Sequence, residues 1–231
     1  MLELVSVDAY YGNSRALDNV SLTVGDGEFV AVLGRNGVGK TTLMRTILGL
    51  MDRTTGSIRF NGTEIGRWRT DQRARAGIAY VPQGRGILPR FSVLDNLRFG
   101  LFANTKGRRE IDESVFDLLP DLRPHLSRLG GNLSGGQQQQ LAIARALMVE
   151  PKVMLLDEPT EGIQPNIVEE IEQIITRINR ERGITVILVE QSVAFARRAA
   201  QRFVIMNKGS IVAAGATAEL DDALVHRYMA V

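Results

Sequence analysis

The segment Gly34–Thr41 contains the residue types that hold phosphate groups. It reads GRNGVGKT and fits the pattern G-x-x-x-x-G-K-[ST], in which glycines turn backbone N–H groups toward an anion and lysine adds a point charge. The apolar run 28–33 before it predicts a buried strand, and residues 41–50, which lack proline, predict a helix after it. This order favours a nucleotide site, with the Thr41 hydroxyl able to bind Mg²⁺, over a chance glycine-rich turn.

Two later segments carry further groups suited to phosphate chemistry. Residues 153–156 predict a strand that ends at Asp157, which is placed to hold Mg²⁺, and at Glu158, which could polarise a water molecule. The segment 133–137 reads LSGGQ and predicts a second anion site, with Ser134 as the N-cap of a helix. An acidic pair alone could cap a helix or lie in a solvated turn, and four consecutive glutamines could be low complexity. The amphipathic pattern around the glutamines favours one turn of helix.

The order of these segments, with Gln83 after a strand at 78–81, resembles the ATP-binding cassette (ABC) ATPases over essentially the whole chain. LSGGQ is the most family-specific part. The resemblance implies an α/β fold: a P-loop NTPase (RecA-like) core with an antiparallel β subdomain and a helical subdomain insertion. It implies a single domain over 1–231, with the core and β subdomain at 1–85 and 149–231 and the helical subdomain, which carries LSGGQ, at 86–148.

The resemblance also implies the cofactors, ATP and Mg²⁺, and the roles of individual residues. Glu158, Gln83 and Gln191 are the expected catalytic residues, and Gln83 would also sense the state of the site. The expected Mg²⁺ ligands are Thr41, Gln83 and Asp157. The residues expected to contact ATP are Tyr11, Gly34, Arg35, Asn36, Gly37, Val38, Gly39, Lys40, Thr41 and Thr42, and, from a second subunit in a head-to-tail dimer, Ser134, Gly135, Gly136 and Gln137.

Tyr11 and Gln83 have alternative interpretations. In the family an aromatic residue ahead of the P-loop stacks on adenine, and Tyr11 has that place, but a tyrosine can also pack on a sheet edge. Gln83 could be a solvated loop residue.

Two positions depart from the family pattern. Gln191 follows Val189 and Glu190 where most members have His, and Gln164 stands where Asp is usual. Glutamine can hydrogen-bond a γ-phosphate but cannot carry positive charge. We therefore expect a heterodimer with a second ABC ATPase that has the His, and a non-hydrolysing scaffold subunit is the alternative.

These departures bear on the solute. The sequence V-E-Q at 189–191 resembles one of the two ATPase subunits of branched-chain amino acid and urea importers. The segments 34–40, 137–147 and 160–165 look closest to the urea-type subunit. The resemblance thus implies uptake of urea or a short amide, with branched-chain amino acids as the alternative.

The expected partners are two transmembrane permease subunits, the second ABC ATPase and, indirectly, a periplasmic or extracellular solute-binding protein. Ile87, Leu88 and Phe91 could contact a permease or belong to the core of the helical subdomain. No stretch reaches the roughly 18 apolar residues of a membrane span, and no secretory signal is visible, so we expect a cytoplasmic protein, peripheral on the inner face of the cell membrane.

Composition argues against other classes of protein. The formal charge of +2 gives no electrostatic argument for nucleic acid, and we expect no nucleic-acid partner. The absence of cysteine excludes disulfides and Cys-based zinc sites. A soluble ABC ATPase that acts on DNA or ribosomes would resemble forms with a long coiled coil or two cassettes, and this chain has neither.

Patterns elsewhere predict the elements around these segments. Trp68 among several arginines predicts a solvated helix face, and the Gly- and Pro-rich stretch 84–92 predicts a hinge. Asn207-Lys208 looks like a GTPase base-reading motif, but Ser210 stands where Asp is expected, which argues against that role. The remaining expectations are strands at 2–7, 20–24, 57–60 and 184–189, a turn at 54–56, hairpin turns at 61–62 and 207–209, and helices at 92–104, 109–119 and 167–178.

Overall fold

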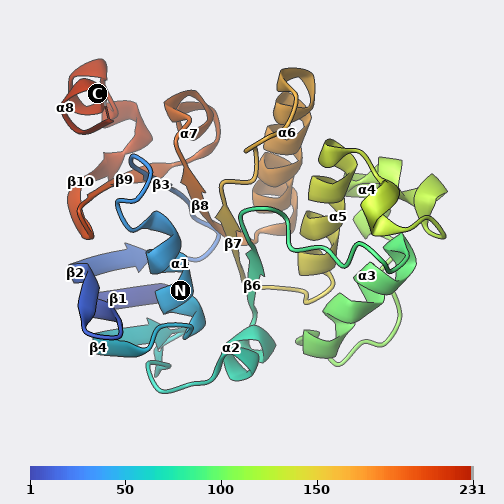
Figure 1. The fold of residues 1–231 in the computed structure, drawn as a ribbon, viewed down its shortest axis with the longest axis horizontal. Helices are drawn as coiled ribbons and strands as arrows, with labels where there is room; N and C mark the ends of the chain where they lie inside the picture. The colour runs from blue at the N-terminus through green and yellow to red at the C-terminus, as the bar shows by residue number, and fades with distance from the viewer. Residues whose placement is uncertain (230–231) are drawn as a thin grey trace. The chain divides into compact units, whose positions relative to one another are not determined.

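The computed structural model describes residues 1–229, and its contacts divide the chain into two compact units (Figure 1). Within the described residues, one unit comprises 1–73 and 185–229, and the other comprises 74–184. The predicted boundaries of a helical insertion at 86–148 stay a prediction. No helix within the described range is both long enough and apolar enough to cross a bilayer.

The first unit contains an antiparallel sheet with the strand order β2-β1-β4-β5. Its strands are β1 (Leu2–Tyr11), β2 (Ser14–Val24), β4 (Arg53–Phe60) and β5 (Thr63–Glu64). Leu2, Leu4 and Val7 of β1 are buried, and the alternation of buried positions is interrupted between Leu4 and Val7, where the pairing with β2 shifts register. Asn61 and Gly62, both with positive φ, connect β4 to β5 as the predicted hairpin turn.

The predicted turn at 54–56 is wrong, because these residues lie inside β4. Gly56 has φ of 83°, and a Cβ at this position would lie 2.4 Å from the carbonyl oxygen of Ser6. The pairing of β1 with β4 shifts register between Val5 and Asp8, beside this glycine. Gly56 therefore marks a β-bulge within a strand instead of the strand's end.

The first unit also contains the strand order β10-β9-β3-β8. Here β3 (Phe29–Leu33) pairs in parallel with both β8 (Thr185–Glu190) and β9 (Arg202–Asn207), and β10 (Ser210–Ala216) forms the predicted hairpin with β9. All residues of β3 and β8 are buried, as expected for parallel strands covered on both faces. The helices of this unit include α1 (Lys40–Leu48), α7 (Val193–Ala199) and α8 (Asp222–Met229).

The second unit combines two parallel strands with helices. Strand β6 (Ile78–Val81) pairs with β7 (Val153–Asp157), in the predicted places. Helix α5 (Gly135–Leu147) packs against α3 (Val93–Gly100) and α6 (Pro165–Arg182). The predicted helix at 109–119 is wrong in extent, because only α4 (Val115–Leu118) forms there. Asp112 accepts the backbone N–H of Ser114, a local bond that competes with helix formation ahead of α4.

The interpretation of the arginines near Trp68 as a solvated face is wrong for Arg73. This residue lies on α2 (Thr70–Ala76), and only 1% of its surface is exposed. Its guanidinium donates to the carbonyl oxygens of Thr46 (3.0 Å) and Ile47 (2.7 Å), in the last turn of α1, and to those of Gly66 and Trp68. Burial lowers the pKa of Arg73. The side chain supplies the donors that the end of α1 needs.

We expect Arg73→Met to lower the free energy of unfolding by about 2–4 kcal/mol, because it leaves several buried carbonyl oxygens without a donor. Urea denaturation followed by circular dichroism measures the change. Arg75→Met, at an exposed position of the same helix, is the matched control and should stay within about 0.5 kcal/mol of the parent. Equal stability of the two variants would contradict a role for Arg73 in holding α1.

Candidate functional site

The glycine-rich loop 34–39 connects β3 to α1 in the first unit, as predicted. Lys40 begins α1 and is only 4% exposed. Its Nζ donates to the carbonyl oxygens of Gly34 (2.8 Å) and Arg35 (3.0 Å), so the ammonium lies across the loop. A helix N-terminus and an ammonium beside one loop form an environment that favours an anion.

The first glycine of this loop cannot be replaced without displacing its neighbours. Gly34 has φ of 152°, and a Cβ there would lie 2.7 Å from the carbonyl oxygen of Met206 and 2.8 Å from Cγ2 of Val38. The requirement for glycine thus comes from close packing of the loop against β9.

The turn between β9 and β10 supports the same loop. Gly209 N donates to the carbonyl oxygen of Val38 (2.8 Å), and Gly209 O accepts from the backbone N–H of Asp18 on β2 (3.0 Å). Gly209 has φ of 82°, and a Cβ there would lie 2.6 Å from the carbonyl oxygen of Ala16. The sequence argues against a base-reading motif here and indicates only a hairpin turn, so the contact of this turn with the glycine-rich loop could not be predicted.

Gln191 follows β8, the strand beside β3. The register pairs Leu33 with Glu190, so Gln191 and Gly34 leave neighbouring parallel strands at the same edge. Glu190 is buried, and its Oε2 accepts the backbone N–H of Gln191 (3.0 Å), whereas the Gln191 side chain is exposed. Glu190 is a supporting residue that the sequence analysis did not identify.

Tyr11 lies at the end of β1 with 40% of its surface exposed. The guanidinium carbon of Arg45, on α1, is 5.5 Å from the centre of its ring. The neighbouring Tyr10 differs, because Arg53 lies 3.8 Å from its ring centre and covers one face. Of the two tyrosines, Tyr11 has the more exposed ring. This ring lies beside α1, the helix that follows the glycine-rich loop.

In the second unit, Asp157 and Glu158 stand at the carboxyl end of β7. Asp157 is fully buried, and its Oδ2 accepts a hydrogen bond from the Tyr80 hydroxyl on β6 (3.1 Å). Glu158 is 8% exposed and has φ of 46°, a left-handed conformation that non-glycine residues rarely adopt. Backbone strain of this kind costs about 1–3 kcal/mol and concentrates at functional sites.

Gln83 lies in the loop after β6, and its side chain is exposed. Its Nε2 donates to Oε2 of Glu161 (2.7 Å), in the loop after Glu158. The second departure from the family pattern, Gln164, is the N-cap residue of α6 and makes no side-chain capping bond. Glu161 was not identified from the sequence, although it follows the acidic pair by only a few residues.

The LSGGQ segment begins α5. Ser134 is the N-cap, and a capping box joins it to Gln137: each side chain accepts a bond from the other residue's backbone N–H. Gly136 packs closely on α6, because a Cβ there would lie 2.4 Å from Cγ2 of Ile167. The predicted cap is confirmed, and the glycine also has a packing reason that the motif alone does not reveal.

Two arginines connect the loop that carries Gln83 to α5. Arg85 Nη1 donates to Oε1 of Gln138 (2.9 Å), and Arg145 Nη2 donates to the carbonyl oxygen of Gly86 (2.7 Å). Burial lowers the pKa of Arg145. Neither arginine was singled out from the sequence, because nothing in their spacing indicates a shared loop.

The chemistry of the proposed Mg²⁺ ligands suits that ion. Asp157, Thr41 and Gln83 all offer oxygen atoms, which Mg²⁺ prefers. Residues 1–229 contain no group of three or more His, Cys, Asp or Glu side chains that could hold a metal by themselves. Mg²⁺ in nucleotide sites uses one or two carboxylates together with phosphate oxygens and water, so a single buried aspartate is compatible with it.

We expect Gly209→Ala to weaken ATP binding by about tenfold or more, because its methyl group would displace the turn that holds Val38. Titration with a fluorescent ATP analogue measures the effect. Gly62→Ala is the matched control: Gly62 has φ of 77°, but a Cβ added there would meet no atom within 4 Å, so it tests backbone strain alone. Similar ATP affinities for the two variants would contradict the supporting role of Gly209.

Comparison with known proteins agrees with this arrangement. Residues 17–161 match the family model described as ABC transporter. The chain is 41% identical to the high-affinity branched-chain amino acid transport ATP-binding protein BraG of Pseudomonas aeruginosa, over 92% of this chain and 91% of that protein. It is 36% identical to the sulfate/thiosulfate import ATP-binding protein CysA 2 of Shewanella oneidensis, over 96% of this chain but 63% of that protein.

Solved structures give the same result. A dimeric ATP-binding cassette in a post-hydrolysis state with ADP and Pi superimposes with a TM-score of 0.81 at 27% identity, over 94% of this chain and 99% of the other. A nucleotide-free cassette from an ABC transporter gives a TM-score of 0.79 at 29% identity, over 94% and 91%. The fold, with an antiparallel sheet, parallel strands and helices, is that of ABC ATPase cassettes, as predicted. The chain therefore belongs to the ABC transporter family, as an ATPase that binds and hydrolyses ATP.

Proposed function

We propose that this ATPase powers the import of a small organic solute as one subunit of a membrane complex. The observation that carries the proposal is the 41% identity to a branched-chain amino acid transport ATP-binding protein along nearly the full length of both chains. A relative named for sulfate and thiosulfate import supports import as the direction of transport.

ATP would be bound by the residues predicted for it. Lys40 and the backbone N–H groups of residues 34–42 would hold the phosphates, and Tyr11, with its open ring, would stack on adenine. Gln191 would reach a γ-phosphate from the edge at which β3 and β8 end. In a head-to-tail dimer, Ser134 and its neighbours 135–137 would contact the nucleotide held by the other subunit.

Hydrolysis would depend mainly on positioning and on charge stabilisation. Glu158 would orient the attacking water molecule or accept its proton. Asp157, Thr41 and Gln83 would bind Mg²⁺, which supplies positive charge to the phosphates. Because Gln83 also contacts Glu161, a change of its partner could report the state of the site to the rest of the complex.

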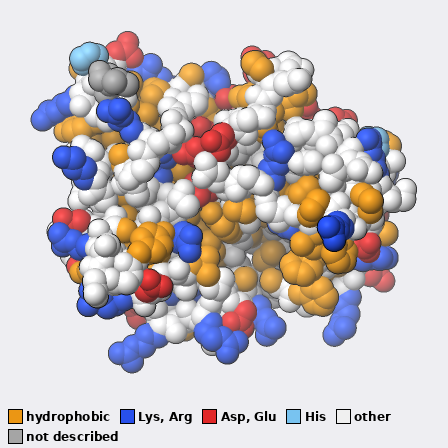
Figure 2. All heavy atoms as spheres, in the orientation of Figure 1, with side chains coloured by type: hydrophobic (Ala, Val, Ile, Leu, Met, Phe, Trp, Pro, Cys, Tyr) orange, Lys and Arg blue, Asp and Glu red, His pale blue; other side chains and the backbone are white. Residues whose placement is uncertain are grey.

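The permease subunits would dock on exposed aromatic side chains of the second unit. Phe91, Phe99 and Phe102 are 53%, 54% and 81% exposed, and Figure 2 shows hydrophobic side chains gathered over α3. Of the residues predicted for this contact, Phe91 is exposed, whereas Ile87 and Leu88 are half buried. The buried Asn96 bonds both the N–H and the carbonyl of Leu88, so the stretch 84–92 is held firmly at this residue. Exposed apolar patches mark interaction sites.

The solute is the finer part of the proposal. The relative's name favours branched-chain amino acids, whereas the segments 34–40, 137–147 and 160–165 favour urea or a short amide. The permease subunits would carry the solute across the membrane, so uptake of labelled leucine and labelled urea by the assembled complex decides between them. The subunit would work at the inner face of the cell membrane, with a solute-binding protein as an indirect partner.

We expect Glu158→Gln to bind ATP normally and to hydrolyse it roughly 10²–10⁴-fold more slowly, because glutamine cannot accept a proton. Single-turnover hydrolysis and nucleotide titration measure the two properties separately. Glu169→Gln, at an exposed position of α6, is the control. Near-normal turnover by Glu158→Gln would remove Glu158 from this role.

Because Gln191 cannot carry positive charge, we expect the purified chain to hydrolyse ATP slowly alone, and about tenfold faster beside a second, His-bearing ATPase. A tagged pull-down from detergent-solubilised membranes, with partners identified by mass, tests the complex. Two multi-span permeases and a second ATPase would support the importer. Full activity of the chain alone would contradict the heterodimer, and recovery of only soluble partners would contradict transport.

A further inference from the structure

The second unit contains a cavity of about 390 Å³ that none of the proposed nucleotide-binding residues lines. It lies among the loop 106–114, α4, the segment after α5 and the last residue of α6. Its volume falls within the roughly 300–1,000 Å³ typical of small-molecule sites. The cavity is therefore large enough for a metabolite of modest size.

Part of the cavity wall is apolar. Val115, Leu118 and Met148 are almost fully buried, and Leu147 and Ile184 are partly exposed. These side chains, with Pro151, give an aliphatic surface that contains no aromatic ring. A surface of this kind suits a branched or straight alkyl group.

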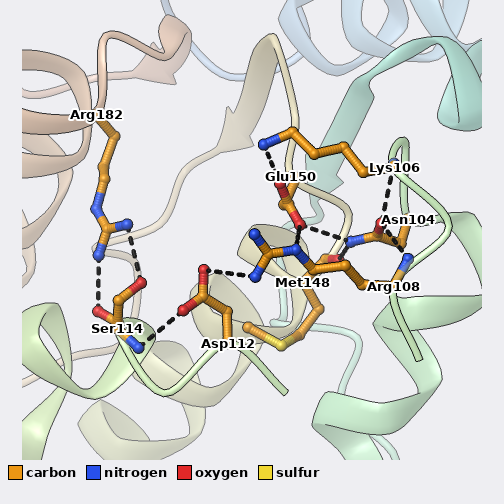
Figure 3. Close-up of polar contacts among 8 residues, drawn as sticks. All are labelled: Asn104, Lys106, Arg108, Asp112, Ser114, Met148, Glu150 and Arg182. Atoms are coloured by element: carbon orange, nitrogen blue, oxygen red, sulfur yellow. Dashed lines mark hydrogen bonds and ion pairs between the residues drawn. The ribbon is translucent and has the colours of Figure 1, made fainter. Parts of the chain in front are cut away.

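The charged residues around the cavity form two groups, which are joined by Arg108 because it is an ion-pair partner of both Glu150 and, at 3.6 Å, Asp112 (Figure 3). In one, Glu150 is an ion-pair partner of Lys106 (2.6 Å) and Arg108 (2.9 Å) and accepts a hydrogen bond from Asn104 (3.3 Å). Burial raises the pKa of Glu150, but these partners outweigh it, and the net pKa is below the ordinary value. The Glu150 charge is thus compensated within the protein.

The other group places a guanidinium and a carboxylate on either side of Ser114. Arg182 donates to the Ser114 hydroxyl (3.0 Å) and to its carbonyl oxygen (2.7 Å), and Asp112 accepts the Ser114 N–H (3.0 Å). These bonds use two of the five N–H donors of Arg182. Hydrogen bonds from Ser114, with Arg108 and Arg182 nearby, hold the pKa of Asp112 below its ordinary value, so it is anionic at neutral pH.

We propose that this cavity binds an aliphatic α-amino acid. In such a molecule the carboxylate and the ammonium are attached to the same carbon, and Arg182 and Asp112 offer opposite charges beside Ser114, to which both are bonded. The ligand's carboxylate contacts Arg182, its ammonium contacts Asp112, and its side chain packs on the apolar wall.

Other ligand classes fit less well. A purely apolar ligand would displace water from the exposed guanidinium of Arg182 and offer it no hydrogen bond in return. A phosphate would meet the carboxylate of Asp112 at close range, which repels it. An aliphatic amino acid offers a carboxylate to Arg182, an ammonium to Asp112 and an alkyl group to the apolar wall.

The position of the cavity would allow a bound ligand to change the rate of ATP hydrolysis. Leu147 ends α5 and Arg182 ends α6, and these two helices begin at the LSGGQ segment and at the loop after Glu158. A ligand between their C-terminal ends would restrain both helices. This regulatory role rests on the proposed function: the imported amino acid, once it has accumulated, binds the cavity and slows ATP hydrolysis.

Isothermal titration of the purified full chain tests the site, with L-leucine, 4-methyl-2-oxopentanoate, which lacks the ammonium, and 3-methylbutylamine, which lacks the carboxylate. We expect leucine to bind tightest. Arg182→Gln should weaken leucine and the oxo acid by about tenfold or more, and Asp112→Asn should weaken leucine but not the oxo acid. Arg180→Gln, an exposed position of α6, is the matched control.

Each variant should retain the ATPase rate of the parent when no amino acid is present, which shows that it is folded. Absence of leucine binding at millimolar concentration in a chain that hydrolyses ATP would overturn the proposal and leave the proposed function intact. Unchanged leucine affinity in both Arg182→Gln and Asp112→Asn would also overturn it. Leucine binding by a chain whose importer takes up urea would support the site and reject the amino acid as the imported solute.

Discussion

The register of two pairs of parallel strands decides where the proposed nucleotide-contacting side chains lie within each unit. In the first unit the pairing of Leu33 with Glu190 brings the start of the glycine-rich loop and Gln191 to one edge. In the second, the pairing of Val81 with Leu156 brings the loop of Gln83 and the Asp157–Glu158 pair to one edge. Because a one-residue slip would move every side chain of these buried strands to the opposite face and disrupt the packing on both faces, this register is strongly fixed.

A second principle connects the loops to these strands. Buried polar side chains, including Arg73, Asn96 and Glu190, form hydrogen bonds with backbone groups that lie in loops or at helix ends. Backbone groups removed from water need such partners, so these residues give irregular segments a defined conformation. The segment 84–92 illustrates this, because its glycines and proline indicate mobility whereas Asn96 and Arg145 hold it at two points.

Local patterns in the sequence predicted the strands before and after the glycine-rich loop, the cap at Ser134 and the amphipathic helix α6, because each depends on residues close together in the chain. The features that could not be predicted depend on contacts with residues far away in the sequence. The burial of Arg73 requires the end of α1, the conformation of Gly56 requires Ser6 on a neighbouring strand, and Gly209 matters through Val38 and Ala16. The motif residues were identifiable, whereas the residues that support them were not.

The left-handed backbone of Glu158 has a consequence for how this chain can evolve. Glycine would adopt that conformation without steric cost, so the position retains a carboxylate at the expense of about 1–3 kcal/mol of backbone strain. Selection of random variants for thermostability alone should therefore favour glycine at this position, at the cost of the carboxylate to which we assign the activation of water. If natural variants keep a carboxylate at this position, selection has retained the catalytic group despite its cost in folding stability.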